Sequence, residues 1–260
     1  MNLIVCVKQV PAPEANVRVN PDTGTLIREG ADCIMNPFDA YAIEEALRIK
    51  EHLGGKVTVI SMGPIQAKEV LKEALAMGCD EAYLLSDPSF AGSDTLATSY
   101  TLSRAILKLA PFDMVLCGKQ AIDGETAQVG PELARWLGIT QVTYVSRIRE
   151  ITGEYLVAER LLEGGTQTVK AALPVLITVV KDINRPRLPG LLGIKRANKA
   201  EIPVWGPVDI GADPSMIGLN GSPTKVEGLK SPPQREGGEV IRGEDEEVIR
   251  LLAQRIVSIV

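Results

Sequence analysis

A loop of small and polar residues at positions 118–130, GKQAIDGETAQVG, carries the residue types best suited to hold a phosphate-bearing ligand. It follows an apolar run at 113–117 that we interpret as a buried strand, and it leads into a helical pattern at 131–137. Backbone N–H groups in such a loop, and the start of the helix that follows, attract phosphate oxygens. The sequence therefore predicts a nucleotide site here, although the loop is neither a GxGxxG fingerprint nor a P-loop. The side chains suited to ribose and phosphate are those of Lys119, Asp123, Thr126 and Gln128.

Alternating strand-like and helix-like patterns must position this loop. Short apolar runs, typical of strands covered on both faces, occur at 3–7, 57–62, 81–85 and 113–117. Amphipathic helices are expected from Asn36 to about 53, from about 66 to 77, and from Ser93 to a residue before Pro111. Such alternation predicts an α/β fold with a mostly parallel, doubly wound sheet and a ligand at the carboxyl ends of its strands.

The pattern changes after the loop and its helix. Residues 142–180 show three extended, alternating segments, interrupted at Thr152-Gly153 and at 163–165, which predicts an antiparallel meander added to the sheet. Prolines and glycines are frequent over 182–244, where periodicity is lost, and residues 245–260 show an amphipathic helical pattern. We therefore expect a nucleotide-binding domain over 1–181, and over 182–260 an extended arm and a C-terminal helix laid over a partner.

The bulk composition excludes several classes of protein. A net charge of −5 gives no whole-surface attraction to nucleic acid, and no apolar run is long enough to be inserted in a membrane. The N-terminal segment resembles a strand rather than a targeting signal, so a cytoplasmic location is expected. A single histidine, His52, and cysteines without CxxC spacing leave little for a metal site or a Ser-His-Asp set. We therefore expect neither a metal nor a catalytic side chain, and any redox chemistry would belong to a bound organic cofactor.

A second segment, 157–178, supports the prediction of a nucleotide site. It contains, in order, Arg160, two leucines, Glu163-Gly164-Gly165, Gln167, Val169, Pro174 and Thr178. This spacing resembles the signature of the electron-transferring flavoprotein beta subunit. The resemblance runs from about residue 3 to the C-terminus, because further matching stretches are VCVKQVP (5–11), MNPFDAYAIEE (35–45), GKQAIDGETAQVG (118–130), NRPR (184–187) and PPQR (232–235).

The resemblance implies a fold similar to that of the adenine-nucleotide α-hydrolases, with an adenine nucleotide in the crevice. Adenine and ribose would contact Cys6, residues 36–39 and Met62, and the phosphates would lie on the backbone of 123–129. Simpler roles stay open for Asn36, as a helix cap, and for Lys8, as the ion-pair partner of a carboxylate. The cofactor-binding residues expected in full are Cys6, Lys8, Asn36, Pro37, Phe38, Asp39, Met62, Gly63, Asp94, Thr95, Thr98, Gly118, Lys119, Gln120, Ala121, Ile122, Asp123, Gly124, Glu125, Thr126, Ala127, Gln128 and Val129.

Members of this family differ in the ligand of this crevice, which is either a structural AMP or a second FAD. Gly124 and Ala127 would leave space for a longer diphosphate ligand. The opening VKQVP resembles the FAD-binding members, although Ala12-Pro13 stands where they have Asp-Thr. Thr95 and Thr98 would add hydroxyls at a helix N-terminus that favours phosphate, unless this helix start is a simple cap. These features favour FAD, with AMP as the alternative.

A bound FAD implies the beta subunit of a heterodimeric electron-transferring flavoprotein. It would take hydride from NADH, pass one electron to FAD in the alpha subunit and then a flavin dehydrogenase, and pass the other to ferredoxin or flavodoxin, which is electron bifurcation. The alternative within the family is an AMP-binding subunit that only relays electrons between a dehydrogenase and an acceptor. An alternative from another class is a nucleotide-binding stress or signalling protein, which would not need the long arm.

Residues 184–199, NRPRLPGLLGIKRANK, combine leucines with a basic cluster. An apolar anchor with a charged rim is typical of protein docking sites, although a solvated loop stays open as the simpler interpretation. The resemblance implies that the matching loop anchors on a dehydrogenase, with Leu191 as the anchoring leucine. The residues expected to dock are Leu191, Leu192, Ile194, Lys195 and Arg196.

Overall fold

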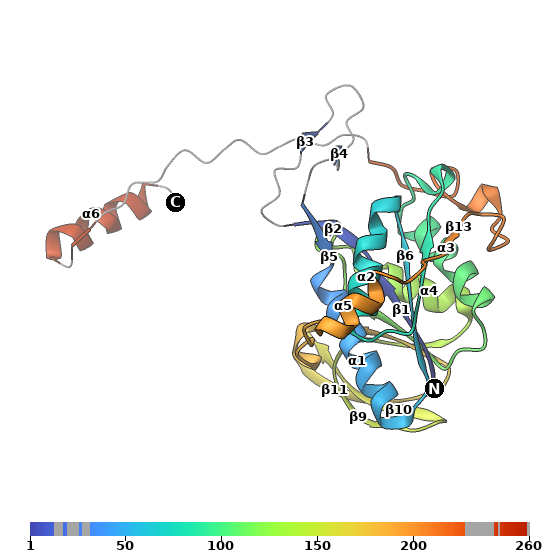
Figure 1. The fold of residues 1–260 in the computed structure, drawn as a ribbon. Helices are drawn as coiled ribbons and strands as arrows, with labels where there is room; N and C mark the ends of the chain where they lie inside the picture. The colour runs from blue at the N-terminus through green and yellow to red at the C-terminus, as the bar shows by residue number, and fades with distance from the viewer. Residues whose placement is uncertain (13–17, 20–25, 28–31, 227–241, 244, 259–260) are drawn as a thin grey trace.

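The computed structural model describes residues 1–12, 18–19, 26–27, 32–226, 242–243 and 245–258. Its centre is a nine-stranded sheet in the order β11-β10-β9-β12-β8-β1-β6-β7-β13 (Figure 1). The strands of this sheet are β1 (Asn2–Val7), β6 (Lys56–Met62), β7 (Glu81–Leu85), β8 (Met114–Gly118), β9 (Thr140–Ile151), β10 (Tyr155–Leu162), β11 (Gly165–Ala172), β12 (Val175–Val179) and β13 (Val204–Trp205). Two short antiparallel pairs are β2 (Gln9–Pro11) with β5 (Cys33–Met35), and β3 (Arg18–Val19) with β4 (Leu26–Ile27).

The neighbouring strands from β9 to β13 in the sheet order all run parallel. The chain passes from β1 to β6 and β7 on one side, and then crosses to β8 on the other side of β1, so the strand order reverses between β1 and β8. Helices α1 and α2 cover one face of the sheet, and α3 and α4 cover the other. Their bounds are α1 (Pro37–Leu53), α2 (Lys68–Met77), α3 (Thr95–Lys108) and α4 (Val129–Leu137). The predicted mostly parallel, doubly wound α/β fold is confirmed.

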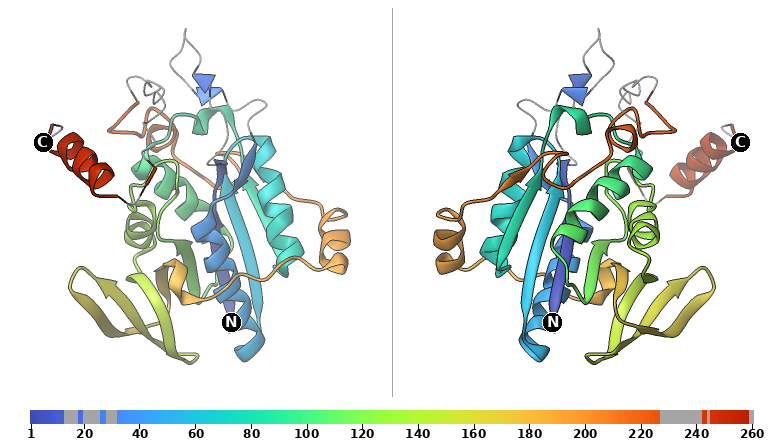
Figure 2. Two further views of the ribbon diagram at one scale, coloured as in Figure 1. Left: turned by 90° about the vertical axis from the view of Figure 1, so that its left-hand side faces the viewer. Right: turned by 90° about the vertical axis from the view of Figure 1, so that its right-hand side faces the viewer.

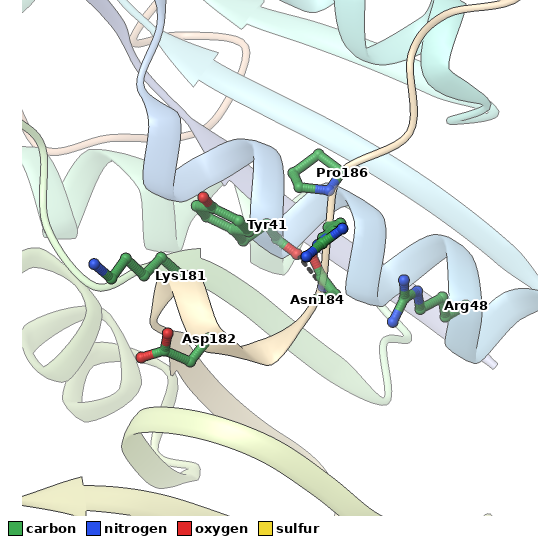
Figure 3. A pocket seen from close by; sticks show the side chains of 7 residues that line it. Tyr41, Arg48, Lys181, Asp182, Asn184 and Pro186 are labelled. Atoms are coloured by element: carbon green, nitrogen blue, oxygen red, sulfur yellow. Dashed lines mark hydrogen bonds between the residues drawn. The ribbon is translucent and has the colours of Figure 1, made fainter.

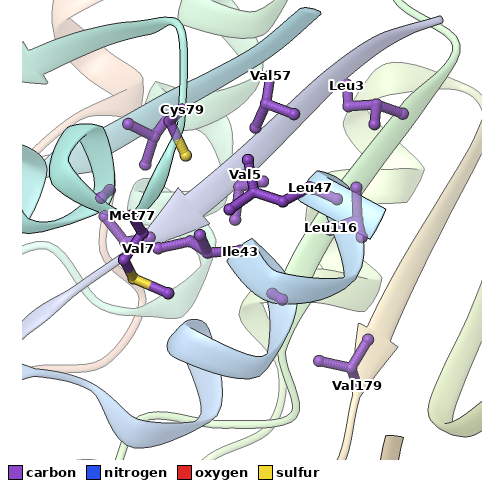
Figure 4. Close-up of a cluster of buried hydrophobic side chains, with 14 of the residues drawn as sticks. Leu3, Val5, Val7, Ile43, Leu47, Val57, Met77, Cys79, Leu116 and Val179 are labelled. Atoms are coloured by element: carbon purple, nitrogen blue, oxygen red, sulfur yellow. The ribbon is translucent and has the colours of Figure 1, made fainter. Parts of the chain in front are cut away.

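Strand β1 shows why its residues form a strand buried on both faces. Leu3, Val5 and Val7 belong to the hydrophobic cluster under α1 and α2, part of which Figure 4 shows. Ile4 and Cys6 belong to the cluster under α3 and α4. Because successive side chains of a strand alternate between faces, a continuous apolar run supplies both clusters at once. Covering both faces fixes the carboxyl ends of the central strands, where the predicted loop begins.

The antiparallel part of the sheet differs from the prediction in one respect. Strands β9, β10 and β11 form the expected antiparallel meander at one edge. The third predicted segment, however, is two strands, because β11 ends before Pro174 and β12 begins after it. Proline has no N–H to donate, which favours a break in the ladder at this point. Strand β12 returns into the parallel sheet between β8 and β9, and all of its residues are buried.

The segment predicted as an arm over a partner is packed on the core along part of its length. Strand β13 extends the sheet beside β7, and Ile202, Ile210 and Ile217 are buried. Helix α5 (Leu191–Ala197) lies beside α2, at the opposite end of the sheet from β9–β11 (Figure 2). The expected boundary at 181/182 therefore does not mark the end of the packed core. The PPQR stretch at 232–235 lies outside the described residues.

The expected C-terminal helix is present as α6 (Glu246–Val257). Asp245 caps it, because its side chain accepts a hydrogen bond from the Val248 N–H at 2.9 Å. Apolar side chains such as Ile249, Leu252 and Ile256 are exposed on this helix. Across the described part of the chain, no helix combines the length and apolarity needed to cross a membrane.

Candidate nucleotide-binding site

The predicted site lies at the carboxyl ends of β1 and β8, where the strand order reverses. In doubly wound sheets this switch point is where ligands bind, because the connections diverge there and leave a crevice. The segments that meet at this edge are Lys8 after β1, the start of α1, and the loop at 119–128 between β8 and α4. The start of α3 reaches the end of this loop through Thr95 and Gln128.

Asn36 holds the first part of the loop in place. It precedes Pro37, the first residue of α1, but its side chain does not cap that helix. Its Nδ2 donates to the Gln120 carbonyl at 2.9 Å, and its Oδ1 accepts from the Ile122 N–H at 3.2 Å. Its backbone N–H donates to the Lys8 carbonyl at 2.9 Å. Asn36 is 1% exposed, so the predicted helix cap is instead a link between β1, α1 and the loop.

Asp39 forms a second link at the same place. Its Oδ2 accepts from the Lys8 N–H at 2.7 Å, and its Oδ1 accepts from Asn36 Nδ2 at 2.8 Å. Burial raises the pKa of this carboxyl to about 7, while hydrogen bonds from Asn36, Lys8 and Gly118 act in the opposite direction. A Cβ at Gly118 would collide with Asp39 Oδ1 and would stand 2.7 Å from Phe38 Cβ. Glycine is therefore required at the end of β8 for α1 to approach this closely.

Lys8 forms an ion pair with the tip of the loop. Its Nζ lies 2.7 Å from Asp123 Oδ1, with side-chain exposures of 43% and 17%. The simpler role that the sequence left open for Lys8, a carboxylate partner, is the one in the structure. Exposed ion pairs contribute little to stability, so the effect of this pair is chiefly to place a cation and the loop tip together.

The second part of the loop offers backbone donors. Glu125 and Ala127 have positive φ angles of 52° and 55°, which are uncommon for residues other than glycine. The Glu125 N–H closes a turn onto the Ala121 carbonyl at 2.9 Å. No acceptor within the described residues pairs with the backbone N–H groups of 126–128. These groups precede the first turn of α4, so the segment combines free N–H donors with a helix N-terminus, as anion sites do.

The start of α4 lies close to the sheet. A Cβ on Gly130, in the first turn of α4, would stand 2.5 Å from Thr178 Cγ2 of β12. Thr178 is buried, and its hydroxyl accepts from the Tyr144 N–H at 3.0 Å.

Lys119, at the start of the loop, turns toward the side of α1 and β9, where its Nζ is 5.5 Å from the Phe38 ring and 5.7 Å from the Tyr144 ring. Tyr144 was not anticipated from the sequence, because its positive φ angle of 59° leaves no sequence signal.

The start of α3 lies beside the loop, and the side chains of Asp94 and Thr95 already have partners there. Asp94 caps the helix by accepting from the Ala97 N–H at 3.1 Å and also accepts from the Thr224 hydroxyl at 2.9 Å. The Thr95 hydroxyl lies 3.2 Å from Gln128 Oε1 and 3.1 Å from Glu132 Oε1. Thr98, in the same first turn, is half-buried.

Glu132, in the first turn of α4, is the second site residue that the sequence did not single out. Its carboxyl accepts from Thr95 and Ser99, and burial raises its pKa. An acidic residue in the first turn of a helix is ordinary. The sequence therefore could not show that Glu132 lies between α3 and α4.

Apolar side chains form the remaining wall. Cys6 and Cys117 are direct neighbours across β1 and β8, and both are buried. A hydrogen bond with Cys117 and burial raise the pKa of the Cys6 thiol well above its usual range, so it stays neutral. Met62 packs against the same cluster. The Gly63 N–H donates to the Leu85 carbonyl at 3.0 Å, which ends β6 in a turn. Neutral sulfur groups next to backbone donors suit a ligand with a flat ring and phosphates.

The predicted docking residues lie away from this crevice, on α5. Leu191 and Leu192 are 87% and 85% exposed, and Ile194 and Lys195 are also exposed. Arg196 has a different role, because its Nη2 donates to the Leu75 and Cys79 carbonyls at 2.8 and 3.0 Å, where α2 ends. It thus fastens α5 to α2.

A cavity of about 600 Å³ lies between α1 and the residues that follow β12 (Figure 3). None of its lining residues belongs to the predicted nucleotide set. They are Tyr41, Arg48, Lys181, Asp182, Asn184, Arg185 and Pro186. This hollow is therefore separate from the switch-point crevice.

The chain has a doubly wound α/β fold, and the predicted loop lies at the switch point of its sheet. The model of the electron transfer flavoprotein domain matches residues 23–209. The electron transfer flavoprotein subunit beta of Thermoanaerobacterium thermosaccharolyticum is 51% identical over 259 residues, covering 99% of this chain and 98% of its own length. That of Megasphaera elsdenii is 49% identical, covering 99% and 100%. The chain belongs to the electron transfer flavoprotein beta subunit family, and the resemblance drawn from its motifs is confirmed.

A relative in a named complex is the caffeyl-CoA reductase-Etf complex subunit CarD of Acetobacterium woodii. It is 49% identical over 244 residues, covering 94% of this chain and 92% of its own length. Protein FixA of Azotobacter vinelandii is 46% identical, covering 94% and 89%. Membership of this family gives the chain a role in electron transfer.

Proposed function

We propose that this chain is a beta subunit that binds FAD in the crevice between β1 and β8 and serves electron bifurcation. The observation that carries the proposal is the run of N–H groups at 126–128, which leads into α4 and has no acceptor among the residues that the structure describes. These donors would hold phosphate oxygens, and Lys8 would add a positive charge at the loop tip. Cys6 and Met62 would form an apolar wall for the adenine.

The residues present fit a phosphate-bearing nucleotide. The Asp123 carboxylate, which would repel phosphate, is paired with Lys8. The Glu132 carboxyl accepts hydrogen bonds from the hydroxyls of Thr95 and Ser99, and burial raises its pKa. When bound, FAD would supply the hydride acceptor and the means to release electrons singly. The chain's own residues would bind and orient it, because hydride transfer needs no protein acid or base.

The proposed donor is NADH. The electrons would pass to FAD in an alpha subunit and onward to a flavin dehydrogenase, and to ferredoxin or flavodoxin. The name of the Acetobacterium woodii relative, subunit of a reductase-Etf complex, supports a dehydrogenase-type partner. The exposed leucines Leu191 and Leu192, on a helix fastened to α2, support a docking role for α5.

An AMP-binding subunit that only relays electrons is the second candidate. The acidic side chains at the start of α3 and α4 favour this candidate. They lie where the hydroxyls of α3 were expected to bind the second phosphate of a longer ligand, and a carboxylate would repel that phosphate. Asp94 is engaged as a cap, and the Thr95 hydroxyl faces Glu132. A Cβ at Gly124 would meet no atom within 4 Å, so there is open space beside this glycine. This space is compatible with either AMP or FAD.

Anaerobic addition of NADH to the purified complex tests the proposal. If this chain binds FAD and oxidises NADH, the flavin absorbance bleaches while NADH is consumed. The added ferredoxin or flavodoxin is then reduced only when the dehydrogenase and the oxidised form of its substrate are also present, because that substrate must accept the other electrons from NADH. Unchanged flavin absorbance with NADH, together with bleaching by the dehydrogenase and the reduced form of its substrate, would instead support the AMP-binding candidate.

A further inference from the structure

The Asp39 carboxyl is surrounded by hydrogen-bond donors from three segments of the crevice. They are the Lys8 N–H at the end of β1, Asn36 Nδ2 at the start of α1, and the Gly118 N–H at the end of β8. Asp39 itself is 5% exposed. One buried side chain therefore joins the two central strands to the first helix at the point where the strand order reverses.

The polar side-chain atoms of Asp39 and Asn36 all have hydrogen-bond partners among the described residues. Both Asn36 Nδ2 hydrogens are used, by Asp39 Oδ1 and by the Gln120 carbonyl, and its Oδ1 is used by Ile122. The Asp39 carboxyl stands against Gly118 with no room for even one added carbon atom. These two side chains therefore join the segments of the site to one another.

We propose that Asp39 is a positioning residue whose ionised carboxylate sets the geometry of the phosphate-binding loop. The inference rests on the proposed function, since it requires that the crevice binds a nucleotide. Two routes connect Asp39 to the loop. In the first route, Asp39 holds the Asn36 side chain, which is hydrogen-bonded to the backbone of Gln120 and Ile122. In the second route, Asp39 holds the backbone of Lys8, whose side chain forms the 2.7 Å ion pair with Asp123.

The donor-only surroundings match the ionised form of Asp39. A protonated carboxyl would direct an O–H toward another donor and lose one of its accepted bonds. Burial opposes ionisation and raises the pKa to about 7. The charged group that faces Asp39 from β1 is Lys8, which also pairs with Asp123 of the loop, and the nearby Cys6 thiol is neutral. As the pH falls through neutrality, Asp39 becomes protonated, and the hydrogen bonds that hold the loop in place weaken.

The test is the Asp39→Asn variant of the full chain, freed of nucleotide and titrated with FAD, whose diphosphate does not titrate near neutrality. The asparagine side chain has nearly the same shape as aspartate, but its NH₂ group replaces one acceptor oxygen. This NH₂ group would face the N–H donors that surround position 39. We expect FAD to bind the variant about tenfold more weakly, or worse, at pH about 8, the loss expected for a broken bond to a charged group. The wild-type affinity falls toward that of the variant at pH about 6, and the variant shows little pH dependence.

Glu45→Gln is the matched control. Glu45 is also a buried carboxyl on α1 with a pKa raised by burial, but its partner is Asn184 Nδ2 at 3.0 Å, away from the loop. We expect this variant to keep the wild-type FAD affinity and pH profile. If AMP binds and FAD does not, the same comparison is made with AMP above the phosphate's own pKa of about 6.

The outcomes separate the inference from the function on which it rests. Equal affinities of wild type and Asp39→Asn, or a wild-type affinity that is flat between pH about 6 and 8, would overturn the positioning role alone. The wild-type profile gives this answer even if the variant does not fold. Failure of the wild type to bind either FAD or AMP would overturn the proposed function, and the inference with it.

Discussion

Gly118 ends β8 and Gly124 lies in the loop that follows, and of the two only Gly118 is in close contact with the rest of the fold. An added Cβ at Gly118 would collide with Asp39, whereas at Gly124 it would meet no atom within 4 Å. We expect Gly118→Ala to lower the free energy of unfolding by about 1–3 kcal/mol, and Gly124→Ala to change it by less than about 0.5 kcal/mol. Urea denaturation of both variants measures the difference. Equal midpoints would mean that α1 does not need its close approach to β8.

Lys8 is expected to affect ligand binding more than folding. Replacement by methionine removes the ion pair with Asp123 and leaves that carboxylate unpaired beside the loop. Because the pair is partly exposed, Lys8→Met should change the free energy of unfolding by less than about 1 kcal/mol. Its nucleotide affinity should fall, since the cation at the loop tip is lost. Lys72→Met, which breaks the exposed pair with Glu69 on α2, is the control. Equal nucleotide affinities of the two variants would contradict the assignment.

Asp39 also gives the stability of the fold a pH dependence with a defined sign. Its pKa rises from 3.8 to about 7 on burial, so the unfolded chain loses the proton at a lower pH than the folded one. The contribution of Asp39 to the free energy of unfolding is therefore largest below pH about 4, decreases up to about 7, and is constant above. Denaturation of wild type and Asp39→Asn over this range should give a difference that shrinks with rising pH. A constant difference would show that the carboxyl is ionised throughout.

The residues of the site could be predicted only where the sequence itself contains the signal. The loop at 118–130 is a run of small and polar residues between a strand and a helix, and the structure places it at the switch point. Asn36 has the sequence of a helix cap, but its partners Gln120 and Ile122 lie far along the chain. A local pattern contains no information on such partners, so its role could not be predicted.

Helix α5 is the element for which the surface makes a specific prediction. It is fastened to α2 by Arg196, and a Cβ on Gly193 would collide with the Ala76 carbonyl. Leu191→Ala should slow electron transfer with the dehydrogenase and leave the nucleotide content unchanged, because the side chain touches the solvent and not the crevice. Ile65→Ala, another exposed apolar residue, is the control. Equal loss of electron transfer and nucleotide would mean that α5 is a structural element only.

The central strands were predictable because burial on both faces requires continuous apolar runs, as in β1 and β8. Strands β12 and β13 were not. The apolar run at 171–180 continues β11 except for Pro174, and the pairing of β12 with β8 is what makes the second part a separate strand of the parallel sheet. Strand β13 has two residues, Val204 and Trp205, too few to show any periodicity. Its place in the sheet comes from pairing with β7 and from stacking of Trp205 on Tyr83 at 4.3 Å.

The molecule as a whole combines a loop at the switch point of its sheet with exposed apolar side chains on α5 and α6. The family assignment gives the chain a role in electron transfer. Because Ile202, Ile210 and Ile217 are buried against the core, the stretch at 202–217 supports the sheet. We therefore expect the contacts with an alpha subunit to fall on the remaining parts of the predicted arm.

The cofactor content of the complex purified with its alpha subunit tests the central claim most directly. The complex is denatured, and the released nucleotides are separated by chromatography and quantified by absorbance. The proposed function predicts FAD in both subunits and no AMP. AMP in this chain, with FAD confined to the alpha subunit, would leave the fold and the crevice as described but would contradict NADH oxidation and bifurcation by this subunit.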